Sequence, residues 1–198
     1  MKTLILVDLQ NDFVAGGTLE VAGGDAVIPV ANRLMPDYEL VIATQDWHPR
    51  NHKSFASQNE GVSVGDVFDL NGLSQIAWPD HCVQGTEGAD FIHDLNVEAI
   101  DKVVQKGTDV DVDSYSGFFD NGKRKATGLC ELLKGEGVTE VDVVGLATDY
   151  CVKFTVLDAI ELGFRVRLIL EGCRGVELTE GDIEEAIEEM RNAGAVIA

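Results

Sequence analysis

Basic residues are scarce in this chain. It carries 15 lysines and arginines against 35 aspartates and glutamates, which gives a formal charge of −20 at pH 7. A surface of this sign repels nucleic-acid phosphates and anionic lipid headgroups. Much of the excess lies between residues 177 and 189, where Ile183 and Ile187 recur at helical spacing, and we interpret it as the solvated face of an amphipathic helix. We therefore expect a small-molecule partner rather than a nucleic acid or a membrane.

Long apolar runs and closely spaced cysteine pairs are also absent. The apolar run near the N-terminus stops before Asp8, which is too short for a signal peptide or a membrane span. Four cysteines without paired spacing are typical of a reducing compartment, so we expect a cytoplasmic protein. A length of 198 residues predicts one domain, residues 1–198. The sequence leaves open whether the chain forms a homo-oligomer.

Apolar, β-branched segments alternate with helical patterns along most of the chain, which predicts a parallel sheet covered on both faces. The expected strands are 3–7, 39–44, 102–105, 141–145, 165–170 and 195–197, and the expected helices are 25–35, 124–134, 150–162 and 179–193. Gly135 and Gly163 stand where helix C-terminal glycines belong. Thr179 and Asp182 resemble a capping box. Residues 45–100 are irregular and polar, and a connection of that length is usually functional.

Four reactive side chains follow predicted strands directly: Asp8, Asp46, Lys106 and Cys151. Parallel sheets bind ligands at the carboxyl ends of their strands, so we expect these side chains to meet at one edge. Cys151 begins a predicted helix, whose dipole favours the nucleophilic thiolate, although a buried structural cysteine is the alternative. Asp8 is a candidate base or else a turn cap, and Lys106 either a charge partner or a solvated lysine.

A second group of residues suggests a metal site. Asp46 and His48 are two apart in an extended segment, so their side chains point the same way and can share one ion. His81 is a candidate third ligand from another loop. Such a pattern is weak by itself, but three of the four histidines fall in the irregular middle region.

Several motifs together resemble the nicotinamidase/pyrazinamidase group of the isochorismatase-like cysteine hydrolases. They occur in that family's order from residue 3 to about 175: Asp8–Phe13, Asp46–Pro49, His52–Phe55, Trp78–Thr86, Lys106–Gly107, Tyr115–Phe118 and Ala147–Val152. The resemblance implies an α/β fold, a three-layer α/β/α sandwich with a six-stranded, mostly parallel sheet. This agrees with the alternation of predicted strands and helices.

The resemblance also implies an activity, the hydrolysis of nicotinamide to nicotinate and ammonia in NAD salvage, with pyrazinamide as a further substrate. Asp8, Lys106 and Cys151 would form the catalytic triad, with Cys151 as the nucleophile of a thioester intermediate. The backbone N–H groups of Ala147 and Cys151 would form the oxyanion hole, next to a cis peptide bond between Leu146 and Ala147.

The same resemblance implies one divalent metal ion on Asp46, His48 and His81 that anchors the ring nitrogen of the substrate. Zinc is our first expectation, and these ligand types also suit iron or manganese. Phe13, Trp78 and Tyr115 would form aromatic walls around the ring.

One departure from the family pattern concerns the metal. Some members carry a further His or Glu ligand where this chain has Ser54, so a fourth contact would come through water. We interpret the neighbouring His52 as a structural or pocket-rim residue, and Cys82, Cys130 and Cys173 as core residues.

Three other functions are alternatives for this sequence. The first is a related amide or carbamoyl hydrolase with another small substrate, which the intact metal set and Cys151 disfavour. A binding protein without turnover would show a broken triad. A thiol sensor would need a resolving cysteine close to Cys151 in the sequence, and none is adjacent.

Overall fold

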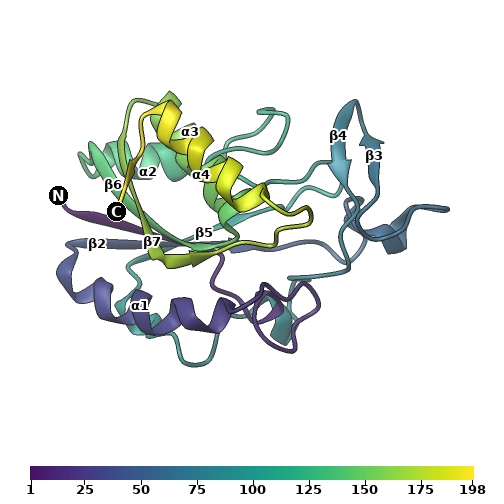
Figure 1. Cartoon of the computed structure of the whole chain (residues 1–198), viewed down its shortest axis with the longest axis horizontal. Coiled ribbons are helices and arrows are strands. Elements are labelled where there is room, and N and C mark those ends of the chain that lie inside the picture. The colour runs from purple at the N-terminus through teal and green to yellow at the C-terminus, as the bar shows by residue number, and fades with distance from the viewer.

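A parallel sheet of six strands forms the middle layer of the computed structural model, which describes residues 1–198 (Figure 1). The strand order is β5-β2-β1-β6-β7-β8, and every neighbouring pair is parallel. The strands are β1 (Thr3–Val7), β2 (Leu40–Asp46), β5 (Lys102–Lys106), β6 (Glu140–Leu146), β7 (Arg165–Arg174) and β8 (Val196–Ile197). All five residues of β1 are buried, as expected of a central strand that is covered on both faces.

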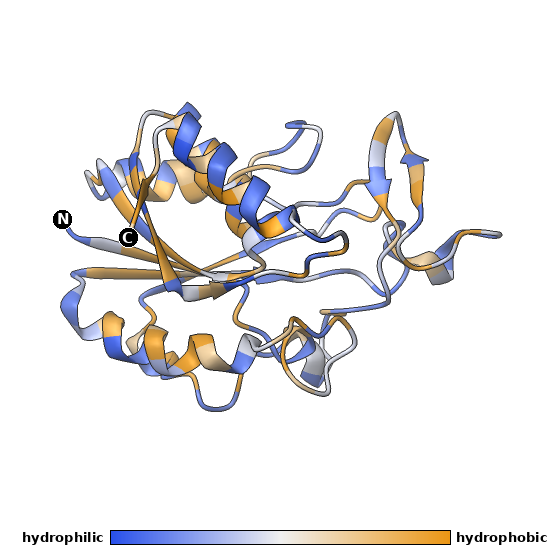
Figure 2. Ribbon diagram, viewed as in Figure 1, coloured by the Kyte–Doolittle hydropathy of each residue, from blue (hydrophilic) through white to orange (hydrophobic).

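Helices cover both faces of this sheet. On one face lies α1 (Val27–Leu34), and on the other lie α2 (Leu129–Gly135), α3 (Lys153–Glu161) and α4 (Asp182–Ala193) (Figure 1). Successive residues of a strand point to opposite faces, so Leu4 and Leu6 pack in the α1 layer while Ile5 and Val7 pack in the other. Apolar strands between helices with polar outer faces are visible in Figure 2. The predicted three-layer sandwich is confirmed, and the sheet is parallel throughout.

The expected strands are all present, but most helix ends differ from the prediction by one to five residues. The helix expected from residue 124 begins only at Leu129, because Asp120 accepts the backbone N–H groups of Gly122 and Arg124 and holds that segment in a turn. Gly135 is the last residue of α2, and the left-handed glycine after it is Gly137, with φ of 72°. Gly163 has φ of 94°, as a residue that ends a helix requires.

The last helix also begins later than predicted. Asp182 accepts the backbone N–H of Thr179 at 2.8 Å, which is one half of a capping box, and α4 starts at Asp182 itself.

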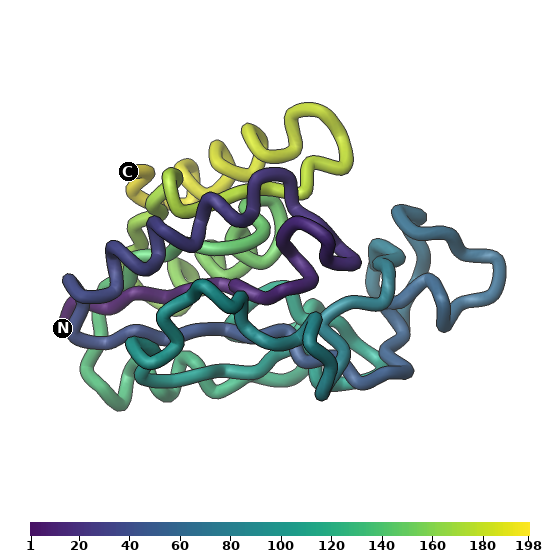
Figure 3. Tube along the Cα trace, turned by 90° about the horizontal axis from the view of Figure 1, so that it is seen from below, coloured from purple at the N-terminus to yellow at the C-terminus, as the bar shows by residue number.

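The irregular middle region contains a hairpin that the sequence reading missed. Strands β3 (Val67–Leu70) and β4 (Leu73–Ile76) pair antiparallel around Asn71 and Gly72, which have φ of 55° and 85°. An Asn-Gly pair with two positive φ angles is the standard signal of a two-residue hairpin turn. The hairpin belongs to an arm that projects from the sheet, opposite the end where the two termini lie (Figures 1 and 3).

None of the helices combines the length and the apolar character that crossing a bilayer requires.

Candidate active site and metal centre

The site lies at the carboxyl ends of the strands, where the chain order of the sheet reverses between β1 and β6. Open parallel sheets bind ligands at such a point because the loops from the two central strands diverge there. Asp8 follows β1, Asp46 and Lys106 end β2 and β5 as partners in the strand register, and Cys151 follows β6. The structure therefore brings together the four side chains that the sequence placed at strand ends.

Lys106 is the centre of this cluster. Its side chain is fully buried, and its Nζ lies 2.8 Å from Oδ2 of Asp8, 2.5 Å from Oδ1 of Asp46 and 3.3 Å from Sγ of Cys151. It also donates to the carbonyl oxygen of Ser114 at 2.9 Å. Burial alone would lower the pKa of Lys106, but Asp46 and Asp8 raise it well above its usual range. The lysine is therefore a permanent buried cation, not a solvated one.

Asp8 is fully buried and has a positive φ of 49°. Its Oδ1 accepts the hydroxyl of Thr44 at 2.6 Å, and that hydroxyl in turn accepts the Asp8 backbone N–H at 3.2 Å. Its Oδ2 accepts no hydrogen bond and has only the ion pair with Lys106. Burial raises the pKa of Asp8, while Lys106 opposes that shift. The carboxylate is thus oriented by Thr44 at one oxygen and faces the Lys106 cation with the other.

Cys151 lies on a π-helical turn, Thr148–Val152, between β6 and α3. Its ligand atom and those of Asp8 and Asp46 lie within 4.8 Å of one another. Gly145 permits the close approach of β6 to β1, because a Cβ there would overlap the backbone of Val7. The peptide bond between Leu146 and Ala147 is cis, as the resemblance implied. Burial raises the pKa of the Cys151 thiol well above its usual range, with Lys106 opposing.

Asp46, His48 and His81 form a compact group of metal-ligand type. Their ligand atoms lie within 4.8 Å of one another, with Oδ2 of Asp46 3.6 Å from Nε2 of His48 and 3.9 Å from Nε2 of His81. The Nδ1 atoms lie 2.9 Å from the carbonyl oxygen of Gly107 and 2.8 Å from that of Pro79, which directs both Nε2 atoms inward. Nε2 of His48 is buried without a hydrogen-bond partner. This donor set fits a divalent ion.

The charge states of Asp46 and His81 suit a cation as well, whereas for His48 burial would lower the pKa but the carboxylate of Asp46 raises it. Burial would raise the pKa of Asp46, but Lys106 and His48 outweigh it and hold the carboxyl below its usual range. Burial and His48 lower the pKa of His81 to about 4, so its imidazole is neutral at pH 7. An ionised carboxylate and a neutral imidazole are the forms that bind metal.

His52 and Ser54 contact each other and are not part of the group formed by Asp46, His48 and His81. Nδ1 of His52 lies 2.7 Å from Oγ of Ser54, and its Nε2 lies 3.3 Å from the carbonyl oxygen of Val112. Both residues are fully buried. His52 is therefore a buried structural residue whose ring centroid lies 4.5 Å from that of His48, which is the first of the two predicted roles.

A small cavity opens beside Cys151 and the metal group. Phe13, Trp78 and Tyr115, the three aromatic residues named from the sequence, line it together with Ala147. Nε1 of Trp78 donates to Oη of Tyr115 at 3.1 Å, which fixes the two rings edge to face. The arrangement provides an apolar slot for a flat ring, with the thiol of Cys151 at one side and Asp46 and His81 at another.

Sequence reasoning missed four further residues of this cavity: Leu19, Asp113, Tyr150 and Val176. Tyr150 is adjacent to Cys151 and stacks edge-on against Trp78. Asp113 is buried, and its carboxylate lies within 4.8 Å of ligand atoms of His48 and His52. No motif marks Leu19 or Val176, since they come from loops whose course the sequence does not state.

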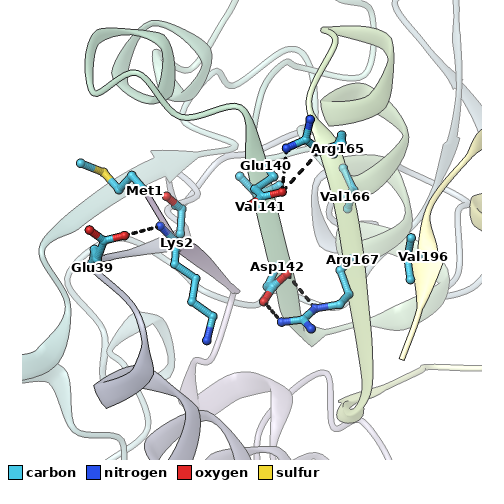
Figure 4. Close-up of a pocket in the computed structure, with 11 residues that line it drawn as sticks. Met1, Lys2, Glu39, Glu140, Val141, Asp142, Arg165, Val166, Arg167 and Val196 are labelled. Carbon is cyan, nitrogen blue, oxygen red and sulfur yellow. Dashed lines mark hydrogen bonds and ion pairs between the residues drawn. The ribbon is translucent and has the colours of Figure 1, made fainter.

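A larger groove of about 630 Å³ lies at the opposite end of the sheet (Figure 4). Its two arginines are already paired, Arg165 with Glu140 and Arg167 with Asp142. It contains no nucleophile and no metal-ligand group. We therefore assign the chemistry to the smaller cavity beside Cys151.

Comparison with known proteins agrees with this geometry. The isochorismatase domain family matches residues 2–198. The nicotinamidase of Escherichia coli (strain K12) is 53% identical over 201 residues, which cover 99% of this chain and 93% of that protein. The structure of a nicotinamidase/pyrazinamidase from Acinetobacter baumannii has a TM-score of 0.96 and 42% identity, covering 99% of this chain and 94% of the other. The pyrazinamidase of Pyrococcus horikoshii in complex with zinc has a TM-score of 0.81 and 39% identity, covering 100% and 98%.

Proposed function

Since this chain belongs to the isochorismatase family of hydrolases, we propose that it hydrolyses nicotinamide to nicotinate and ammonia with Cys151 as the nucleophile. The observation that carries the proposal is the position of Lys106. Its Nζ contacts Sγ of Cys151, Oδ2 of Asp8 and Oδ1 of Asp46, and so joins a thiol–carboxylate pair to a metal-ligand group. Pyrazinamide, which also carries a ring nitrogen and a carboxamide, is a second substrate, and NAD salvage is the pathway.

In the first half of the reaction, Asp8 takes the thiol proton of Cys151 as Sγ forms a bond to the amide carbon. The oxygen of the tetrahedral intermediate is held by the backbone N–H groups of Ala147 and Cys151. Asp8 then gives its proton to the amide nitrogen, the C–N bond breaks, and ammonia leaves. Lys106 keeps the same charge throughout and stabilises both the Asp8 carboxylate and the sulfur.

In the second half, water attacks the thioester carbon and gives its proton to Asp8. The C–S bond breaks, the Cys151 sulfur recovers that proton, and the acid gives its remaining proton to solvent as nicotinate is released. One carboxylate therefore acts twice as base and twice as acid.

Asp46, His48 and His81 would hold a divalent ion, for which we propose zinc. When bound, the ion supplies an electrophilic anchor for the ring nitrogen of the substrate. Phe13, Trp78 and Tyr115 hold the faces and the edge of the ring, so that the carboxamide meets Cys151.

Ammonia release from nicotinamide by the purified, zinc-loaded protein tests the proposal. We expect turnover by the wild type and a loss of at least about a thousandfold in Cys151→Ala. Cys130→Ala is the matched control, because Cys130 is also buried but lies on α2. Turnover that survives in Cys151→Ala would exclude the thioester mechanism. A wild type that releases no ammonia from nicotinamide or pyrazinamide would exclude the function.

A further inference from the structure

Asp149 is a buried carboxylate that the mechanism does not use. Its residue is 5% exposed, and no lysine, arginine or histidine pairs with it. Its partners are two successive backbone N–H groups: Val176 donates to Oδ1 at 3.0 Å and Glu177 donates to Oδ2 at 2.7 Å. A buried carboxylate held in this way fixes the position of the segment that donates to it.

The two segments joined by Asp149 are both part of the active site. Asp149 lies on the π-helical turn, two residues before Cys151. The donors belong to the loop that joins β7 to α4 at the same end of the sheet (Figure 1). In that loop, the side chain of Val176 lines the substrate cavity and packs against the apolar cluster that contains Ala147.

The two segments that Asp149 joins differ in how firmly other contacts hold them. The π-helical turn is held without Asp149, because the carbonyl oxygen of Ala147 accepts the N–H groups of Tyr150 and Val152 at 3.1 Å each. The loop has less support of its own. Glu177 has a positive φ of 53°, which a residue other than glycine adopts only when its surroundings enforce it. Loss of the link should therefore release the loop and leave Cys151 in place.

We propose that Asp149 is a positioning residue that fixes Val176 as a wall of the substrate pocket. This inference rests on the proposed function. Asp149 then has a role in substrate binding, although it does not touch the substrate. It acts through the loop between β7 and α4, where Val176 lies 27 residues further along the chain. Gly175 permits this arrangement, because a Cβ there would overlap Ile183 of α4 and crowd Asp149.

Asp149→Asn tests this role. The substitution keeps the size of the side chain but puts an NH₂ group where one backbone N–H needs an acceptor, so at least one of the two bonds is lost. We expect the KM for nicotinamide to rise about tenfold and kcat to stay within about threefold. The control is Asp158→Asn, a buried carboxylate of α3 that pairs with Lys123 away from the cavity, and both constants should be unchanged there.

A double-mutant cycle separates positioning from a purely structural effect. Val176→Ala should raise KM by itself. If Asp149 acts by placing Val176, the double variant should have a KM within about twofold of that of Asp149→Asn. Independent effects would multiply instead, and that result would overturn the proposal. A fall in kcat with KM unchanged would also overturn it, because the residue would then act on Cys151.

Hydrogen exchange supplies a readout that does not depend on activity. In Asp149→Asn the amides of Val176 and Glu177 should exchange at least about tenfold faster, while those of residues 148–152 stay protected. Equal protection of the loop in wild type and variant would contradict the link. If the variant shows faster exchange than the wild type but the wild type has no turnover, the proposed function is wrong and the link between Asp149 and the loop still stands.

Discussion

At the scale of single residues, the charge states of Cys151 and Asp8 are the central question. A cysteine at a helix N-terminus is expected to have a lowered pKa, but burial raises the pKa of Cys151, and the carboxylates of Asp8 and Asp46 add to that rise. The pKa of Asp8 is also raised by burial. The thiol of Cys151 therefore stays protonated at neutral pH, so in the proposed mechanism its proton is removed within the catalytic cycle.

The pH profile of kcat/KM should follow from this pair. Asp8 can accept a proton only above its own pKa, which lies above 3.8, so activity should fall as the pH falls through that raised value. The thiol remains protonated to beyond pH 9, so the rate should be level from above the pKa of Asp8 to at least pH 9. Initial rates between pH 4 and pH 10 measure both the fall at low pH and the level region above it. A rate that climbs continuously up to pH 10 would show that a preformed thiolate is the active form.

The sequence predicted which residues would meet, but not how Lys106 connects them. Asp8, Asp46, Lys106 and Cys151 follow strands, and parallel strands end at one edge of a sheet, so their proximity could be expected. The ion pair between Lys106 and Asp46 depends on the pairing of β2 with β5 in one register. Register between strands about 60 residues apart is a property of the packed sheet, and local residue patterns do not state it.

At the scale of elements, the end of β5 controls the metal group. Gly107 has φ of 63°, and a Cβ there would overlap the imidazole of His48. Gly107→Ala should therefore displace His48 and reduce bound zinc at least about tenfold, with a rise in KM for nicotinamide. Elemental analysis of the purified variant measures the metal directly.

Gly163→Ala is the matched control for this substitution. Gly163 also has a positive φ, of 94°, but no atom lies within 4 Å of a Cβ built there. This variant should lose roughly 1 kcal/mol of stability from backbone strain and keep its full zinc content. Equal zinc in both variants would mean that the close contact of Gly107 does not position His48.

Elements with a strong local signal were predictable and those shaped by their context were not. The six strands of the sheet were found within a few residues, because each is a short apolar run between turn residues. The β3–β4 hairpin was missed because its strands are half exposed and lack a clear alternation, although Asn71-Gly72 would have marked its turn. The late start of α2 depends on hydrogen bonds that Asp120 accepts from the backbone, which a helical pattern of apolar residues does not reveal.

At the scale of the whole molecule, the charge of −20 acts differently on substrate and product. Nicotinamide is neutral and enters without electrostatic cost, whereas nicotinate is an anion that the protein's field repels. The field reaches about 30 Å at 0.01 M salt and only about 8 Å at 0.15 M. The surface charge therefore favours product release, most strongly at low salt.

Product inhibition measures this effect. The inhibition constant of nicotinate should fall by about threefold or more between 0.01 M and 0.15 M salt, while the KM of neutral nicotinamide changes by less than about twofold. A nicotinate constant that is independent of salt would show that the site is shielded from the surface charge.

Lys106 also sets a limit on how this enzyme could be redesigned. In the proposed mechanism the metal anchors the ring nitrogen, so a new substrate without that nitrogen would make the metal group dispensable, and Asp46 would be the obvious residue to replace. Yet Asp46 is also a counter-ion of the lysine that supports Asp8 and Cys151. An apolar residue at position 46 would leave Asp8 as the one carboxylate paired with Lys106, and breaking a buried ion pair costs several kcal/mol, so the change would alter the acid–base chemistry together with the proposed substrate anchor. A change of specificity at this metal group therefore has to retain an anion beside Lys106.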